Sequence, residues 1–171
     1  MNGRTSLAAP DCIKARSPRY AIDRIVIHAQ DGTQAGTEAW FKQPGRTPPT
    51  AAHYLIGRDG AVVQMVPDDR KAIHAGSPTE AGWNDRSIGL EFEVRCNPWK
   101  GRARFPLNDW TSAMLDAGAG VTAILCAKFW IPANRVHIVG HSEVPGATHT
   151  DPGPAFPWDM FMAAVVARMG A

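Results

Sequence analysis

The chain has 171 residues, of which 44% are hydrophobic and 20% charged, and its formal net charge is +2. This length suits one domain with one core, and the balance of apolar and charged residues excludes disordered, collagen-like and coiled-coil classes. A net charge of +2 without a basic run of five or more residues gives no support for a nucleic-acid partner. We therefore expect a single domain over 1–171, in which 1–20 form an irregular N-terminal arm.

Cysteine usage and the N-terminal sequence bear on the compartment. Cys12, Cys96 and Cys126 are widely spaced and form no C-x-x-C pair, so a reducing compartment is favoured. The first twenty residues contain no apolar run of seven or more, and no run of about eighteen apolar residues occurs anywhere. We expect a monomer that is made in the cytoplasm without a signal peptide and has no membrane or nucleic-acid partner.

The first half of the chain predicts strands, a hairpin and one short helix. An apolar strand over 22–29 carries His28 near its end, and a helix over 37–42 is capped by Thr37. Alternating segments over 51–56 and 61–66 flank a turn at 58–60 and predict a β-hairpin. Successive strand side chains alternate, so His53 and Tyr54 lie on opposite faces of the first hairpin strand. The segment 67–86 has the composition of a loop.

The second half predicts one amphipathic strand and two core helices. In the strand 87–94, Ile88, Leu90, Phe92 and Val94 form an apolar face, while Glu91 lies on the face that is free to line a cleft. A helix over 109–130, capped by Asn108, carries an apolar stripe. A buried strand over 135–139 and a terminal helix over 156–169 follow. The stripe comprises Met114, Val121, Leu125 and Phe129, widened by Leu115, Ile124 and Cys126, and Gly118 allows close approach of another element.

Two histidines and one aspartate lie at the ends of predicted strands. His28 closes the first strand, His141 follows the last, and Asp151 lies ten residues further on. If the two strands are parallel neighbours, both histidines emerge at one edge of the sheet and the turn returns Asp151 to them. Two His and one carboxylate, with a position open to water, suit catalytic zinc, and the same set also suits ferrous iron. The spacing alone is a weak signal, because no H-E-x-x-H motif is present.

Six segments resemble the zinc-dependent N-acetylmuramoyl-L-alanine amidases, a family that includes phage endolysins, muropeptide-recycling amidases and peptidoglycan recognition proteins. They run in order over about 22–165 and read IVIH, AAHYLIGRDG, HAG, WNDRSIGLEFE, VGHSEVPG and HTDPGPAF. The resemblance implies an α/β fold with a mixed central sheet flanked by helices and a zinc cleft on the sheet. It implies Zn²⁺ bound by His28, His141 and Asp151, and hydrolysis of the amide between N-acetylmuramic acid and L-alanine in peptidoglycan or muropeptides.

The resemblance also suggests roles for other residues. Glu91 matches the Glu of the SIG-x-E motif and is expected to be the general base or the group that orients the water. Tyr54 matches a Tyr that phage-type members use near the zinc water, so the division of this task between Glu91 and Tyr54 stays open. His149 stands where many members carry a Lys that stabilises the oxyanion, so protonated His149 is expected to take that role. The residue types of the loop, rather than the resemblance, give a further expectation, because aromatic Trp83 beside Asn84 suits a polar ligand. Substrate contacts are therefore expected from His74, Trp83 and Asn84, although a solvated surface loop is an alternative for that segment.

Several functions remain open on this sequence. Tyr54 favours a phage endolysin that acts on the cell wall, and the alternative is a cytosolic amidase that recycles anhydro-muropeptides. A non-catalytic peptidoglycan-binding module is disfavoured because all three ligand residues are present. A zinc peptidase that cuts within the stem peptide is a further alternative, which the released termini distinguish.

Overall fold

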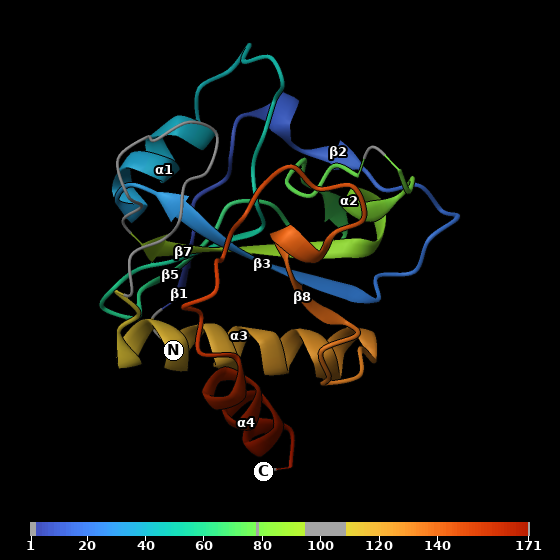
Figure 1. Ribbon diagram of the computed structural model, residues 1–171. Helices are drawn as coiled ribbons and strands as arrows, with labels where there is room; N and C mark the ends of the chain where they lie inside the picture. The colour runs from blue at the N-terminus through green and yellow to red at the C-terminus, as the bar shows by residue number, and fades with distance from the viewer. Residues whose placement is uncertain (1–2, 78, 95–108, 171) are drawn as a thin grey trace.

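A six-stranded mixed sheet lies at the centre of the computed structural model, which describes residues 3–77, 79–94 and 109–170 (Figure 1). Neighbouring strands are parallel except β4 and β5, which form the predicted antiparallel hairpin. The order across the sheet is β1 (Gly3–Thr5), β5 (Val62–Gln64), β4 (Tyr54–Ile56), β7 (Ser87–Val94), β3 (Arg24–Asp31) and β8 (Ile138–Gly140). A small antiparallel sheet joins β2 (Lys14–Ala15) to β6 (Arg70–Lys71).

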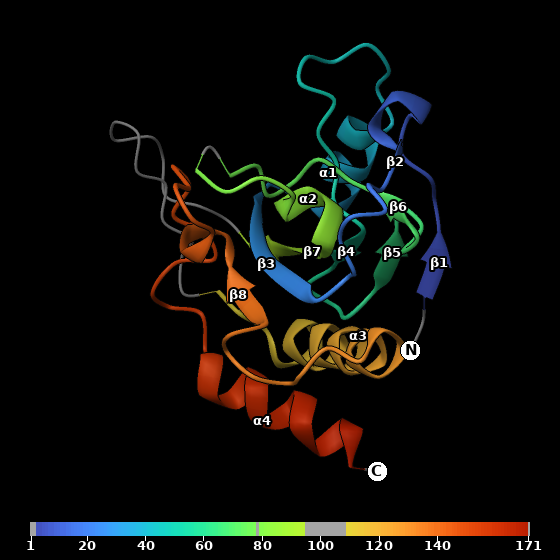
Figure 2. The ribbon, with the colours of Figure 1, turned by 90° about the vertical axis from the view of Figure 1, so that its right-hand side faces the viewer.

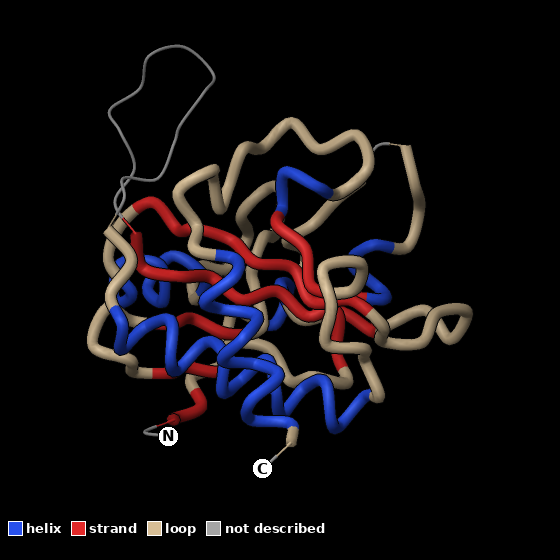
Figure 3. The backbone as a smooth tube through the Cα atoms, turned by 60° about the horizontal axis from the view of Figure 1, so that its bottom comes forward, coloured by secondary structure: helices blue, strands red, loops and turns tan. Residues whose placement is uncertain are grey.

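Helices cover both faces of the central sheet. The long helix α3 lies along one face, α4 packs on the outer side of α3, and α1 and α2 lie on the opposite side of the sheet (Figures 1 and 2). When the α4 side is turned forward, these two long helices lie in front of the strands (Figure 3). The α-helices in the described part of the chain are Gln34–Phe41 (α1), Trp83–Arg86 (α2), Ser112–Phe129 (α3) and Trp158–Met169 (α4). The 3-10 turns there are η1 (Pro10–Cys12) and η2 (His141–Glu143). The predicted α/β class with a mixed sheet flanked by helices is confirmed.

Two helix starts differ from the prediction because other threonines supply the caps. Thr33 Oγ1 accepts a hydrogen bond from Gly36 N, so α1 begins earlier than a Thr37 cap would place it. Thr111 Oγ1 accepts from Met114 N and caps α3. An N-cap needs extended backbone and a side-chain oxygen that reaches the first turn, which both threonines provide. The predicted cap Asn108 lies outside the described residues, as does Cys96.

The main core lies between the sheet and α3. Ile25 and Ile27 of β3 and the apolar face of β7 pack against α3 and α4. Gly118 allows the predicted close approach: a Cβ atom there would lie 2.3 Å from Phe92 Cζ. Ile124, expected to widen the buried stripe, is instead 55% exposed.

Helix α3 is also long and apolar enough to pass a length and composition test for a membrane span. Of its apolar window, 61% is buried inside the molecule. It contacts β7 on one side and α4 on the other, so its hydrophobicity is explained by packing on two sides.

The N-terminal arm and the last strand differ from expectation. Residues 1–20 were expected to be irregular, but β1 adds a parallel edge strand to the sheet by pairing with β5. The last strand is displaced from 135–139 to Ile138–Gly140, and Val136 is 66% exposed. His137 precedes this strand and contacts Asn134 Oδ1 rather than the site. The displacement places His141 directly after the last strand residue.

Candidate active site

The parallel pairing of β3 and β8 brings His28 and His141 to one edge of the sheet. Val26 pairs with Val139 and Ile27 with Gly140, so the next residue of each strand is a histidine. Both histidines are buried. The predicted neighbouring parallel strands are therefore confirmed, together with the convergence that depended on them.

The loop after η2 returns to this edge and delivers Asp151. Ser142 N donates a hydrogen bond to the Asp151 carbonyl at 2.9 Å, which fixes the returning chain against the turn that begins at His141. Gly140 leaves the necessary space, because a Cβ atom there would lie 2.7 Å from Pro152 Cδ. The Asp151 side chain thus faces both histidines.

Three potential ligand atoms converge at nearly equal distances. His28 Nδ1 and His141 Nδ1 are 3.1 Å apart, and each lies 3.1 Å from a carboxylate oxygen of Asp151. Tetrahedral zinc with bonds of about 2.0–2.1 Å places its ligand atoms roughly 3.3 Å apart. The spacing and the N, N, O donor set therefore fit a zinc ion, which His28, His141 and Asp151 would hold beside the cleft that they line.

Electrostatics in this cluster favour metal ligation. Burial, with a smaller contribution from the neighbouring His141, lowers the pKa of His28 to about 4, so the ring is neutral and can offer a lone pair. Burial alone would raise the pKa of Asp151, but its close contacts with His141 and His28 outweigh burial and hold the pKa well below the usual range. A neutral imidazole and an ionised carboxylate are the forms that bind zinc.

A chain of hydrogen bonds orients His28 from behind. Its Nε2 lies 3.0 Å from His74 Nδ1, His74 Nε2 lies 3.2 Å from Ser87 Oγ, and Ser87 Oγ donates to the Trp83 carbonyl at 2.5 Å. When His28 Nδ1 binds a metal, the ring proton lies on Nε2 and is donated to His74. Each donor in this series of hydrogen bonds then faces an acceptor, which favours that tautomer of His28.

The ring of His74 is itself held in place. Asn84 Oδ1 accepts from the backbone N–H groups of His74 and Ala75 at 2.9 and 2.8 Å. The His74 ring lies directly over Gly89, where a Cβ atom would be 2.5 Å from its Nδ1. Burial, followed by the nearby His28 and His53, lowers the pKa of His74 well below its usual value, so the ring is neutral as the chain requires.

A second buried histidine and an arginine brace this network. His53 Nδ1 accepts from Gly89 N at 3.0 Å, and its Nε2 lies 2.8 Å from an Arg16 Nη2 atom. Arg16 also donates to the carbonyls of Asp68, Asn84, Asp85 and Ser87. Burial lowers the pKa of Arg16 to about 10. Through Arg16, the N-terminal arm that was expected to be irregular thus connects the loop at Asp68 with α2 and the start of β7.

Glu91 lies beside the cluster. It is the register partner of His28, so the two side chains project from the same face of adjacent parallel strands. Among residues 3–77, 79–94 and 109–170, no side chain or backbone group donates a hydrogen bond to its carboxylate. Burial, with a smaller contribution from Asp151, raises the pKa of Glu91 to about 8. A carboxylate with this pKa can accept a proton near neutral pH.

An open cleft of about 600 Å³ leads to these groups. His28, His141, Asp151, Glu91 and His149 all line it. The His149 ring stacks on His141 with centroids 4.5 Å apart, its Nδ1 lies 3.9 Å from Asp151 Oδ1, and its side chain is 67% exposed. It therefore presents a polar edge to a molecule in the cleft. The opposite wall comes from α1 and the loop before it, and includes Gly32, Thr33, Gly36, Thr37, Trp40 and Phe41.

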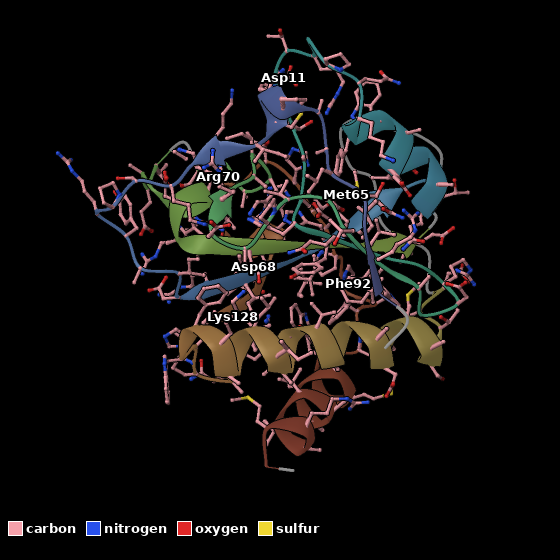
Figure 4. All side chains as sticks on the ribbon, turned by 180° about the vertical axis from the view of Figure 1, so that it is seen from behind. Asp11, Met65, Asp68, Arg70, Phe92 and Lys128 are labelled. Atoms are coloured by element: carbon pink, nitrogen blue, oxygen red, sulfur yellow. The ribbon has the colours of Figure 1, made fainter. Side chains whose placement is uncertain are left out.

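Tyr54 lies on the other face of the sheet, which corrects its predicted place near the metal. It pairs with Leu90 in register and packs on the main core, whereas the neighbouring Leu55 pairs with Glu91. Its hydroxyl donates to Asp68 Oδ1 at 2.6 Å, and Lys128 of α3 binds the same carboxylate at 2.7 Å. Figure 4 shows Asp68 and Lys128 on this α3 side of the sheet. Burial and Asp68 raise the pKa of Tyr54, so it remains a neutral donor there.

Trp83 and Asn84, expected to contact substrate, do not line the cleft. Trp83 is buried with Val26, Ala75 and Val139, and Asn84 holds the backbone at His74. Both support the site from behind because α2 turns them inward before β7. His74, the third of these predicted residues, lines the cleft, and its ring nitrogens bond to His28 and Ser87.

Sequence reasoning missed Arg16 and Ser87, and it did not single out Gln30, which also lines the cleft. Only Gln30 had a usable signal, because it lies two residues after His28 in a strand and must share its face. Arg16 and Ser87 act through contacts between segments that are distant in sequence.

Comparison with known proteins is consistent with this geometry. The family model described as N-acetylmuramoyl-L-alanine amidase matches residues 18–154. The 1,6-anhydro-N-acetylmuramyl-L-alanine amidase AmpD of Salmonella typhimurium is 40% identical over 118 residues, which are 67% of this chain. The alignment spans 57% of that relative's length.

Two solved structures are also similar. The crystal structure of a selenomethionine derivative of AmpD has a TM-score of 0.73 at 28% identity and covers 96% of this chain and 94% of that chain. The Escherichia coli amidase AmiD, in complex with anhydro-N-acetylmuramic acid-L-Ala-D-gamma-Glu-L-Lys, has a TM-score of 0.69 at 25% identity. That match covers 88% of this chain and 59% of that chain.

Proposed function

The chain belongs to the N-acetylmuramoyl-L-alanine amidase family, and we propose that it hydrolyses the amide bond between the lactyl group of N-acetylmuramic acid and L-alanine. The observation that carries this proposal is the convergence of His28, His141 and Asp151 at 3.1 Å on the floor of an open cleft, beside Glu91. This is a metal-hydrolase arrangement with room for an extended substrate.

His28, His141 and Asp151 would hold a zinc ion. When bound, zinc supplies Lewis-acid polarisation of the scissile carbonyl and makes a water more acidic. The His74–Ser87 chain keeps the His28 tautomer that ligation needs.

Glu91 is the proposed general base. Its burial and its place beside His28 let it take a proton from the attacking water, and the protonated carboxyl can then deliver that proton to the leaving L-alanine nitrogen. The bond that forms joins the water oxygen to the lactyl carbonyl carbon, and the C–N bond breaks. The products are a lactyl carboxylate and a peptide with a free amino terminus.

His149 is the proposed donor to the oxyanion that develops on the scissile carbonyl. Its exposed edge faces the cleft while its ring is held by stacking on His141. A protonated imidazole is the stronger donor, and the neutral ring can still donate one hydrogen bond.

Soluble anhydro-muropeptides are the proposed substrates. Tyr54 gave the reason to favour a cell-wall lysin, and that reason fails because Tyr54 lies on the α3 face of the sheet. The name of the Salmonella relative specifies a 1,6-anhydro-N-acetylmuramyl substrate, which supports the recycling alternative. Preference for intact sacculi over soluble fragments would reverse this choice.

The test is product analysis by mass spectrometry. Zinc-loaded protein is incubated with an anhydro-muropeptide and with purified sacculi, with and without chelator, and His28→Ala serves as the inactive control. Release of a peptide that begins with L-alanine, dependent on metal, supports the amidase. Cleavage within the stem peptide indicates a peptidase, and binding without new termini indicates a non-catalytic module.

A further inference from the structure

A buried carboxamide in the cleft has no partner. Gln30 is 5% exposed, lines the cleft, and neither its Oε1 nor its Nε2 makes a hydrogen bond within the part of the chain that the structure describes. Buried polar groups in folded proteins are nearly always paired, and an unpaired amide costs its full desolvation. Two unsatisfied atoms on one cleft side chain therefore need an explanation.

The neighbours of Gln30 do not supply one. Its register partner on β7 is Glu93, whose Oε2 already accepts from Arg58 N at 3.1 Å. By contrast, Gln34 a few residues away donates its Nε2 to the carbonyls of Leu55 and Ala61 at 3.1 and 2.9 Å. The carboxamide of Gln34 thus has a structural role through its two backbone acceptors, whereas the carboxamide of Gln30 makes no such hydrogen bond.

The position of Gln30 relative to the metal ligands indicates what it can bind. It lies on the same face of β3 as His28, two residues further along, so the two Cα atoms are separated by roughly 6.6 Å. That is about the length of two residues of an extended peptide, so a substrate group at Gln30 lies close to the bond held at the metal ligands. A carboxamide offers an NH₂ donor group and a carbonyl acceptor, which match a secondary amide that presents a carbonyl and an N–H.

We propose that Gln30 is a specificity residue that binds a secondary amide of the substrate adjacent to the scissile bond, donating from Nε2 to its carbonyl and accepting its N–H with Oε1. The inference rests on the proposed function. A muropeptide carries two such amides, the 2-acetamido group of the sugar and the peptide bond after L-alanine. Both have the chemistry that Gln30 requires, and the substrate series below distinguishes them.

The unpaired carboxamide of Gln30 lowers the stability of the free protein, and substrate recognition would explain why a glutamine stands at this position. An apolar side chain of the same size would fill the space without unpaired atoms, so Gln30→Leu is expected to keep or raise the melting temperature. Gln34→Leu removes two hydrogen bonds and is expected to lower it. The same chemical change at the two positions thus separates a ligand-binding carboxamide from a structural one.

The experiment compares zinc-loaded wild type, Gln30→Leu and Gln34→Leu on three substrates. These are an anhydro-muropeptide, its N-deacetylated form, and a form in which an ester replaces the amide after L-alanine. Gln30→Leu is expected to lose about 10- to 100-fold in kcat/KM on the intact substrate, mainly through KM. On the substrate that lacks the amide bound by Gln30, wild type and Gln30→Leu become similar, which identifies that amide.

Unchanged kcat/KM in Gln30→Leu on the intact substrate overturns the inference while the amidase function stands. An equal loss on all three substrates, or a lowered melting temperature like that of Gln34→Leu, also overturns it, because it indicates a structural role. If zinc-loaded wild type hydrolyses none of the three, the proposed function fails and this inference fails with it.

Discussion

The two faces of strands β3 and β7 carry opposite chemistry although they are built from alternate residues of the same segments. Toward α3 they present Ile25, Ile27, Leu90 and Phe92, all buried in one apolar cluster. Toward the cleft they present mainly polar and ionisable groups, including His28, Gln30 and Glu91. The apolar face stabilises the fold through burial. This stabilisation offsets the free energy that is lost when polar groups on the cleft face are removed from water. Changes on the two faces should therefore affect different measurements.

The largest effect is expected from Glu91→Gln on the cleft face. Loss of the proposed base should lower kcat/KM by about 10²- to 10⁴-fold, while zinc content and thermal stability remain. Steady-state hydrolysis and metal analysis on the same preparations check this. Activity within threefold of wild type would remove Glu91 from its role.

The pH profile sharpens the assignment of Glu91. Burial raises its pKa from 4.5 to about 8, and the positive charge of bound zinc lowers it again. A base must be ionised, so activity is expected to rise with pH along a limb whose midpoint lies between these two values. Glu91→Gln should lose this limb, and an unchanged limb in that variant would assign it to another group.

The opposite face should respond in stability. Phe92 packs edge-on against Phe156 and Phe161 and lies under Gly118, so Phe92→Ala should lower the free energy of unfolding by about 3–5 kcal/mol. Ile124→Ala, on an exposed position of α3, should change it by less than about 1 kcal/mol. Denaturant unfolding measures both. Equal effects of the two changes would contradict the packing described for α3.

A smaller effect is expected behind the metal site. His74→Phe removes the acceptor for His28 Nε2 and should weaken zinc binding by about 10- to 100-fold, measured by competition with a chelator. Ser87→Ala, one step further along the chain, should weaken it less. His137→Phe, outside the site, is the control and should bind zinc as wild type does. Unaltered zinc affinity in His74→Phe would show that the hydrogen bonds through His74 and Ser87 do not orient His28.

The smallest effect is expected at His149, which is 67% exposed and held mainly by stacking. His149→Phe keeps the stacked ring and should lose less than about tenfold in kcat/KM, because solvent weakens an exposed donor. His149→Lys supplies another cationic donor and should retain more activity than His149→Phe. Unchanged kcat/KM in His149→Phe would contradict the oxyanion role.

The sequence predicted well wherever periodicity within one segment decided the structure. The bounds of β7, the face of Glu91 and the hairpin of β4 and β5 follow from alternation, and the parallel meeting of His28 and His141 follows from two strand ends. Tyr54 was misplaced because its role was taken from a motif match. The alternation of strand side chains puts Tyr54 on the α3 face, opposite the face that carries Glu91. Arg16 and Ser87 could not be found, since their contacts depend on how distant loops pack.

The most direct test of the central claim is a titration of metal-free protein with zinc while the release of amino-terminal L-alanine from an anhydro-muropeptide is followed. Because His28, His141 and Asp151 form a single donor cluster, activity should rise linearly and level off at one zinc per chain, and Asp151→Ala should abolish the rise. Full activity in the chelated protein, or one bound zinc without any released amino terminus, would contradict the claim.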